Sequence, residues 1–147
     1  MAKRSSHPLL SHADELATNL ADSLLLIGRV LIAAMFLLTV WFGSPTAAYL
    51  TSINYVSPEG MSLLARIAEW IIVVSLVLGL GTRYGALLGL VFVIIATATA
   101  HRYWGYPQAA QLVQYTFLVK NLAAAGGLIL LFVTGAGRFS VDSKLSA

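Results

Sequence analysis

The chain has 147 residues and a formal net charge of +3, and 59% of its residues are hydrophobic while only 10% are charged. A soluble domain carries about a quarter of its residues as charged side chains, and so short a chain cannot bury this much apolar surface in one core. The composition therefore indicates an integral membrane protein. The basic residues form no run that would follow a phosphate backbone, which argues against nucleic acid as a partner, and the absence of cysteine excludes disulfides and thiolate-bound metal centres.

The N-terminal part of the chain combines a polar segment with a first membrane span. Residues 1–23 are polar, and we expect a cytoplasmic tail or a surface helix there. Residues 24–42 are apolar except for Arg29, and such a run is long enough to cross a hydrocarbon core of about 30 Å as a helix. Because acidic residues precede this run and it exceeds the usual apolar region of a signal peptide, we expect it to remain as an anchor.

The rest of the chain predicts three more spans. Residues 43–60 contain two Ser-Pro pairs among aromatic and aliphatic residues, which predicts a short segment lying at the membrane interface. Further spans are predicted over residues 61–80, 84–104 and 112–134, and the third of the four ends in an aromatic cluster typical of an interface. A polar tail over 135–147 follows. The predicted fold is all-α, with a four-helix transmembrane domain over residues 24–134.

The distribution of basic residues predicts the orientation. Positively charged residues of short loops remain on the cytoplasmic side. Two such residues, Arg66 and Arg102, fall in or beside the loops that join the first two and the last two spans. The tails and the middle loop hold Lys3, Arg4, Arg83, Arg138 and Lys144. We therefore expect both termini in the cytoplasm and a multi-pass protein of a bacterial-type inner (plasma) membrane.

Small residues recur every four positions on two of the predicted helices. In lipid, helices associate largely through close backbone approach, which small residues permit. We expect the packing faces to be formed by Gly81, Gly85 and Gly89 on the third helix and by Ala123 and Gly127 on the fourth. A homo-oligomer interface is the alternative role for these faces.

Ionisable residues at membrane depth are costly and usually face the bundle interior or a water-filled cavity. We hypothesise that Glu69 and Lys120 form an interhelical pair in the outer half of the bundle. We expect the same cavity to be lined by Gln114, Asn121 and His101. A structural ion pair that fixes helix register is the alternative, and an arginine could instead extend to lipid phosphates. The candidate ligand-binding residues are Arg29, Arg66, Glu69, His101, Lys120 and Asn121.

The polar residues also limit the chemistry. Three cations and one carboxylate at membrane depth favour an anionic or carbonyl-bearing guest, such as a quinone or a lipid headgroup. Haem held by two histidines is not expected, because His101 is the only histidine near the membrane. The sequence contains no P-loop, no dinucleotide fingerprint and no cluster of metal ligands. We therefore expect no intrinsic cofactor, no metal and no catalysis by this chain alone.

Several stretches occur in an order and spacing typical of one known family. They are Gly28 to Ala34, Arg66 to Glu69, Leu78 to Ala86, and Phe117 to Leu122 with Gly126 and Gly127 behind it. Together they extend over residues 24–142, and on these stretches the chain resembles the DoxX family of small four-helix membrane proteins. The sequence departs from that pattern after Trp41, where a lysine of the family is absent. It also lacks a DoxA-like part.

This resemblance implies a four-helix bundle and, in some members, a subunit of a thiosulfate:quinone oxidoreductase or of another membrane-associated oxidoreductase complex. We therefore expect an accessory or quinone-adjacent subunit, whose partners are the lipid bilayer and other membrane proteins or further copies of the chain. A purely structural subunit and a small-solute transporter remain as alternatives, although four helices with one ion pair enclose little space for transport.

Overall fold

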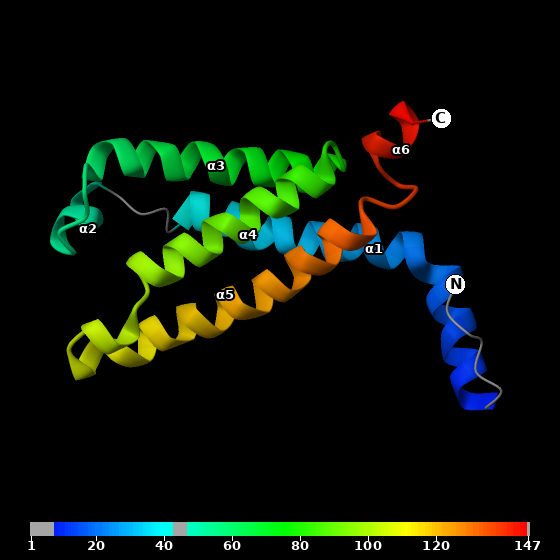
Figure 1. Cartoon of the computed structure of the whole chain (residues 1–147), viewed down its shortest axis with the longest axis horizontal. Helices are drawn as coiled ribbons and strands as arrows, with labels where there is room; N and C mark the ends of the chain where they lie inside the picture. Colours follow the sequence, from blue (N-terminus) through cyan, green and yellow to red (C-terminus); the bar gives the residue numbers. More distant parts are fainter. Residues whose placement is uncertain (1–7, 43–46, 147) are drawn as a thin grey trace.

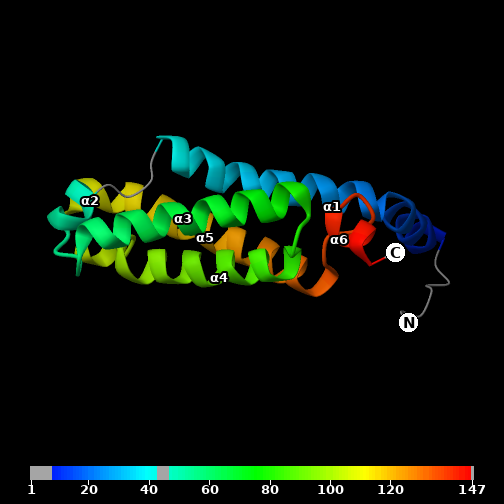
Figure 2. The same ribbon diagram turned by 90° about the horizontal axis from the view of Figure 1, so that it is seen from above.

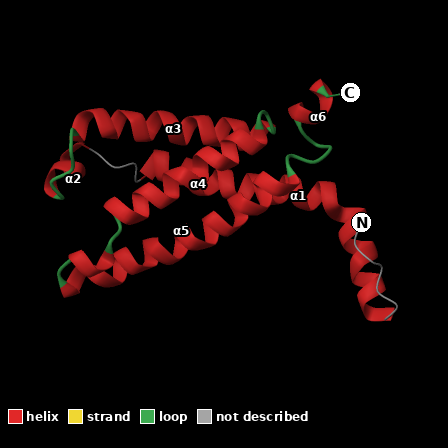
Figure 3. Cartoon of the chain, viewed as in Figure 1, coloured by secondary structure: helices red, strands yellow, loops and turns green. Residues whose placement is uncertain are grey.

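The computed structural model describes residues 8–42 and 47–146, and within these ranges all regular structure is helical (Figure 3). Four helical segments are long and apolar enough to cross a membrane, which confirms the predicted fold class. Lys3 and Arg4, used in the orientation argument, and the start of the predicted interfacial segment lie outside the described residues. The four segments are Ser11–Phe42, Pro58–Leu78, Thr82–Gly105 and Gln108–Thr134.

The helices form an elongated bundle with two distinct ends (Figures 1 and 2). The short helix α2 lies at one end, and the turn between α3 and α4 lies with α6 at the other. We refer to these as the α2 end and the α6 end. The elements are α1 (Pro8–Phe42), α2 (Ala47–Ser52), α3 (Pro58–Leu78), α4 (Thr82–Thr99), the 3-10 helix η1 (Tyr103–Gly105), α5 (Gln108–Thr134) and α6 (Val141–Leu145).

Helix α1 begins at Pro8, so much of the polar N-terminal segment continues into the first spanning helix. Figure 1 shows this early part, in dark blue, pointing away from the other helices. Its side chains over residues 12–21 are exposed, including Leu16 and Leu20, which lie on one face of the helix. The segment has the character of a surface helix.

The core of the bundle is formed by a few large side chains and by close helix contacts. Phe36, Ile72, Leu76 and Leu128 are at most 1% exposed. Glycines allow the backbones to approach: a Cβ on Gly85 would collide with Ser75 of α3, and one on Gly89 would press on Leu128 of α5. Gly127 likewise faces Ile32 of α1. Among the other predicted packing residues, Ala123 is exposed and Gly81 caps a helix.

Two glycines and a distant carboxylate build the turn at the α6 end. Gly79 ends α3 with φ +66°, and Gly81 precedes α4 with φ +58°. The first amides of a helix have no partner within the helix. Here Asp142 supplies one, since its carboxylate accepts hydrogen bonds from Gly81 N at 2.6 Å and Thr82 N at 2.9 Å. Asp142 N in turn donates to Gly79 O at 2.9 Å, so the C-terminal segment closes this end of the bundle.

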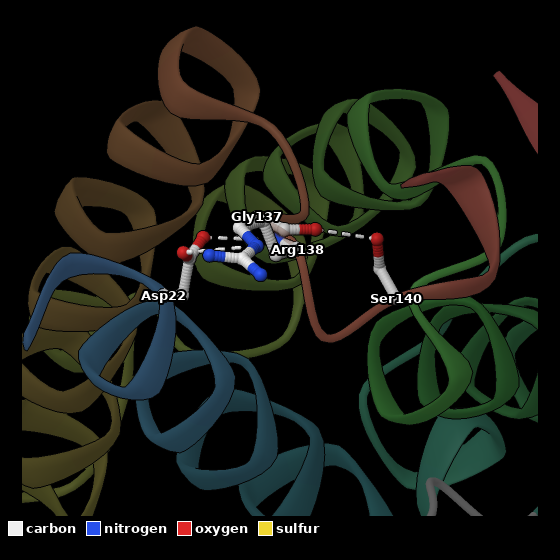
Figure 4. A network of polar contacts seen from close by, with 4 residues as sticks. All are labelled: Asp22, Gly137, Arg138 and Ser140. Carbon is white, nitrogen blue, oxygen red and sulfur yellow. Dashed lines mark hydrogen bonds and ion pairs between the residues drawn. The ribbon is translucent and has the colours of Figure 1, made fainter. Parts of the chain in front are cut away.

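The same C-terminal segment is also joined to α1 (Figure 4). Asp22 accepts a hydrogen bond from Arg138 N at 2.8 Å, and its carboxylate lies 3.9 Å from Arg138 Nε. Ser140 Oγ donates to Gly137 O at 2.6 Å, which tightens the loop between these contacts. Because the Arg138 side chain is 83% exposed, the ion pair itself adds little stability; the backbone hydrogen bond fixes the position of the loop.

Candidate ligand-binding cavity

A cavity of about 490 Å³ lies toward the α2 end of the bundle. Side chains from α1, α2, α3, α4 and α5 line it, and most of them are aliphatic or aromatic. A mostly apolar pocket with a few convergent polar groups is the usual form of a small-molecule site. The polar side chains on its wall are Thr39, Tyr49, Tyr55, Glu69, Thr99, His101 and Gln114.

Glu69 reaches the cavity because of its place on α3. It shares one helical face with Ile72, Val73 and Leu76, at spacings of three, four and seven residues, and all four are buried. The three apolar residues turn this face toward the bundle interior, so the carboxyl group enters with them. Glu69 is 0% exposed. Because burial of a carboxylate in apolar surroundings is costly, the carboxyl group requires polar or charged neighbours.

A hydrogen-bonded network closes the cavity at its outer edge. His101 Nδ1 lies 2.9 Å from Gln114 Oε1, and the His101 ring packs on Phe117 with 4.7 Å between centroids. Tyr49 OH and Tyr106 OH both donate to the carbonyl oxygen of Ala100, at 3.0 and 2.9 Å. Burial first, and then the hydrogen bond with Tyr106, raise the pKa of Tyr49. The Tyr49 phenol therefore remains a protonated donor.

The cavity gathers some of the predicted residues and leaves others outside. Glu69 and His101 line it, as does Gln114. Arg66 is exposed on α3. Lys120 is not on the wall; its ammonium lies over the Phe117 ring, 5.2 Å from the centroid. The charge of Glu69 acts on Lys120, which agrees with the hypothesis that the two residues pair. The pairing itself stays a prediction.

Asn121 and Arg29 do not line this cavity. Asn121 Nδ2 donates to Thr97 Oγ1 at 2.9 Å, so it joins α5 to α4. Arg29 is 0% exposed, which excludes the alternative that it extends to lipid phosphates. It lies at the α6 end, where Nη2 donates to Phe139 O at 2.5 Å. The structure therefore does not bring Arg29 to the cavity that contains Glu69.

The charge of the cavity also differs from the expectation. Its wall carries one acidic side chain, Glu69, and no lysine or arginine among the described residues. Three cations predicted an anionic or carbonyl-bearing guest, but none of them lines the wall. Arg66 is exposed, Lys120 lies over Phe117, and Arg29 lies at the α6 end. The cavity itself therefore favours a neutral guest. Within the described residues no group of three potential metal ligands comes together.

Sequence reasoning missed the tyrosines of the network and of the cavity wall. Tyr49, Tyr55 and Tyr106 occur in the two segments predicted to lie at the interface, where tyrosine is common without a specific role. Their positions along the chain do not show that α2 and η1 lie at the same end as Glu69 and His101. Only the folded arrangement brings Tyr49 within hydrogen-bonding distance of Tyr106, at 3.1 Å between the hydroxyl oxygens.

Comparison with known proteins gives one family and one curated relative. The model of the SURF4 family matches residues 2–146. The inner membrane protein YphA of Escherichia coli (strain K12) is 29% identical over 128 residues, which cover 82% of this chain and 89% of the relative. No solved structure matches.

These matches correct the resemblance to the DoxX family, which is wrong because the matching family model is a different one. The features that carried the resemblance were a helix-one arginine, a helix-two glutamate, a Thr-Arg turn and a Lys-Asn pair. They are short and separated, and such features do not distinguish one set of small helical membrane proteins from another.

Proposed function

This integral membrane protein belongs to the SURF4 family, and we propose that it is an inner-membrane accessory subunit that holds a neutral amphiphile in the cavity at the α2 end. The name of the E. coli relative supports the location. The composition of the cavity supports the binding role, because its wall is mostly apolar and carries a few polar side chains. We propose no reaction at this site.

The observation that carries the proposal is the cavity itself. Its volume of about 490 Å³ falls within the range of about 300–1,000 Å³ that is usual for small-molecule sites. The apolar wall fits the body of an amphiphile, and the polar groups at the outer edge fit its head. A quinone and a membrane lipid both have this form, and a bound quinone would place the subunit beside a redox partner.

The cavity is bordered by side chains that also face outward. Leu64 of α3 and Val91 and Ile95 of α4 line it and are nevertheless 58%, 45% and 48% exposed. These residues lie within spanning helices, so their exposed surface faces lipid. Because side chains of α3 and α4 border both the cavity and the lipid, we expect the guest to enter from the bilayer, where an amphiphile is already concentrated.

Transport by a single copy is less well supported. Toward the α6 end from the cavity, Phe36, Ile72, Leu76 and Leu128 form a core at most 1% exposed. A solute pathway would require polar or water-filled space through that region. The structure therefore favours binding at one end of the bundle over passage through it.

Two tryptophan variants test the proposal. Leu64→Trp adds an indole at the border of the cavity, whereas Leu63→Trp adds one to a neighbouring side chain that is 62% exposed and does not line it. Each variant and the wild type are purified from native membranes into nanodiscs, and retained small molecules are identified by mass spectrometry. We expect wild type and Leu63→Trp to retain the same amphiphile.

Leu64→Trp should retain about tenfold less, since overpacking by an added ring costs at least about 1.4 kcal/mol. Equal retention by the two variants would contradict binding in this cavity. A wild-type protein that purifies with no amphiphile would contradict the binding role.

A further inference from the structure

The hydrogen-bonding groups of the cavity indicate which kind of polar head its guest carries. Resting on the proposed function, we infer that the guest is a membrane-dissolved molecule whose polar end is a hydroxyl group, which donates its hydrogen bond to Glu69 or His101. Most hydrogen-bond donors of the wall are used within the protein, whereas Glu69 and His101 offer acceptors.

Most donors of the wall are directed at the protein backbone. Thr39 Oγ1 donates to Met35 O at 2.9 Å, and Thr99 Oγ1 donates to Ile95 O at 2.6 Å. Tyr49 OH donates to Ala100 O at 3.0 Å. Each hydroxyl has a single hydrogen to give. These three side chains therefore have no hydrogen left for an acceptor on the guest.

Gln114 determines which nitrogen of His101 is an acceptor. The Gln114 side chain is also hydrogen bonded to Tyr49, whose own hydrogen goes to Ala100, so the amide NH₂ is the donor to the Tyr49 oxygen. The amide oxygen then faces His101 Nδ1, 2.9 Å away, and accepts a hydrogen bond from it. In the neutral ring with hydrogen on Nδ1, Nε2 is an acceptor.

Glu69 adds the strongest acceptor on the wall. A carboxylate offers about four lone-pair sites, so it can accept a hydrogen bond from a guest in addition to contacts within the protein. Hydrogen bonds to a charged acceptor are about twice as strong as those between neutral groups. The wall therefore offers acceptors from Glu69 of α3 and from His101, which follows α4. It is matched to a guest that donates a hydrogen bond.

A hydroxyl fits this wall better than a cationic donor. The remaining wall is mostly apolar, where an added cation would lose its hydration without a dedicated counter-charge. Lys120 lies beside the wall, with its ammonium 5.2 Å from the centroid of the Phe117 ring, and its positive charge would repel a second cation. Tyr55 lies on the wall, and its side-chain hydroxyl can both donate to and accept from a hydroxyl.

Two classes of membrane molecule present such a hydroxyl: a quinol, and a glycerolipid with a free hydroxyl group. The test uses both, each beside a matched ether that cannot donate: a decyl-substituted benzoquinol and its dimethyl ether under anaerobic conditions, and dioleoylglycerol and its O-methyl ether. Binding to the wild-type protein in phosphatidylcholine nanodiscs is titrated by native mass spectrometry.

We expect a hydroxyl compound to bind about tenfold more tightly than its ether, which corresponds to about 1.4 kcal/mol. The pair that shows the preference identifies the source of the hydroxyl. Glu69→Met should reduce the ratio toward one. His101→Phe, which keeps the ring against Phe117, should reduce it as well and serves if Glu69→Met does not fold. Glu59→Gln, an exposed change in the first turn of α3, should leave it unchanged.

The outcomes separate the inference from the proposed function. Equal binding of hydroxyl compounds and ethers, with retention still lost in Leu64→Trp, would overturn the inference and leave the cavity as a binding site. A preference that survives both Glu69→Met and His101→Phe would also overturn it. If no probe binds and the wild type retains no amphiphile, the proposed function fails.

Discussion

At the scale of single residues, Gly79 shows how the α6 end depends on one position without a side chain. Its φ of +66° lies in the left-handed region, which residues with a Cβ seldom adopt. A Cβ there would also collide with the guanidinium of Arg29 and with Ser140. The peptide at Gly79 therefore packs directly on a fully buried arginine and on the C-terminal segment.

Two glycine-to-alanine substitutions test whether Gly79 is required for its backbone conformation and close packing. The second substitution shows what alanine does at an unconstrained position. Gly79→Ala should lower the free energy of unfolding by about 2–3 kcal/mol, since it combines backbone strain with a steric collision. Gly28→Ala, one residue before Arg29 in the sequence and with nothing within 4 Å of the added Cβ, should be neutral or stabilising by up to about 1 kcal/mol. Thermal unfolding in detergent measures both, and equal losses would contradict the constraint.

Sequence reasoning reached individual residues where a polar group at membrane depth was conspicuous. Glu69 and His101 were candidates because ionisable side chains in a membrane are costly and usually face the interior, and both line the cavity. The partner of Arg29 could not be predicted, because Phe139 lies 110 positions away in the chain. No periodicity within one helix carries that information.

At the scale of elements, the short helix α6 positions the cap of a spanning helix. Asp142 acts for α4 as an N-cap side chain normally would, although α4 begins after a glycine that has no side-chain oxygen. Burial by itself would raise the pKa of Asp142. The hydrogen bonds from Thr82 and Gly81 and the positive charge of Arg29 outweigh it and lower the pKa below the ordinary 3.8.

Removal of this cap should therefore have a pH-dependent effect. Asp142→Ala should cost about 1 kcal/mol of stability near neutral pH, as for other N-cap removals. Because the folded-state pKa lies below the unfolded one, the contribution is complete above the ordinary pKa and is lost as the pH falls through the lower folded value. The difference in unfolding temperature between wild type and variant should shrink below about pH 4.

Lys144→Ala, an exposed change in the same helix, should match the wild type at every pH. A difference between wild type and Asp142→Ala that stays constant between neutral and strongly acidic pH would contradict the role of the carboxylate.

Hydropathy was sufficient to predict the spanning helices, because in lipid the whole circumference of a helix can be apolar and the signal is strong. It was not sufficient for the connections. The helical continuity of α1 back to Pro8 and the short helix α6 depend on contacts such as that between Asp22 and Arg138. Such contacts join segments that no local pattern relates.

At the scale of the whole molecule, the orientation in the membrane stays a prediction that the charge distribution favours. The chain has no cysteine, so single cysteines can be introduced without background. Arg102→Cys, at the exposed start of the loop after α4, should react with a membrane-impermeant maleimide in intact spheroplasts. Lys144→Cys, exposed in α6, should react only after the membrane is permeabilised. The opposite labelling pattern would invert the orientation, and with it the side to which the cavity lies nearer.

The cap on α4 also has a consequence for the order of events during synthesis. Asp142 follows the amides it binds by 61 and 60 residues, so α3 and α4 emerge from the ribosome long before their turn has its acceptor. Until then, the first amides of α4 must be hydrated at the membrane surface. Residues made long after α4 therefore complete the turn between α3 and α4, and a ribosome that stops before Asp142 releases four spanning helices with one end still open.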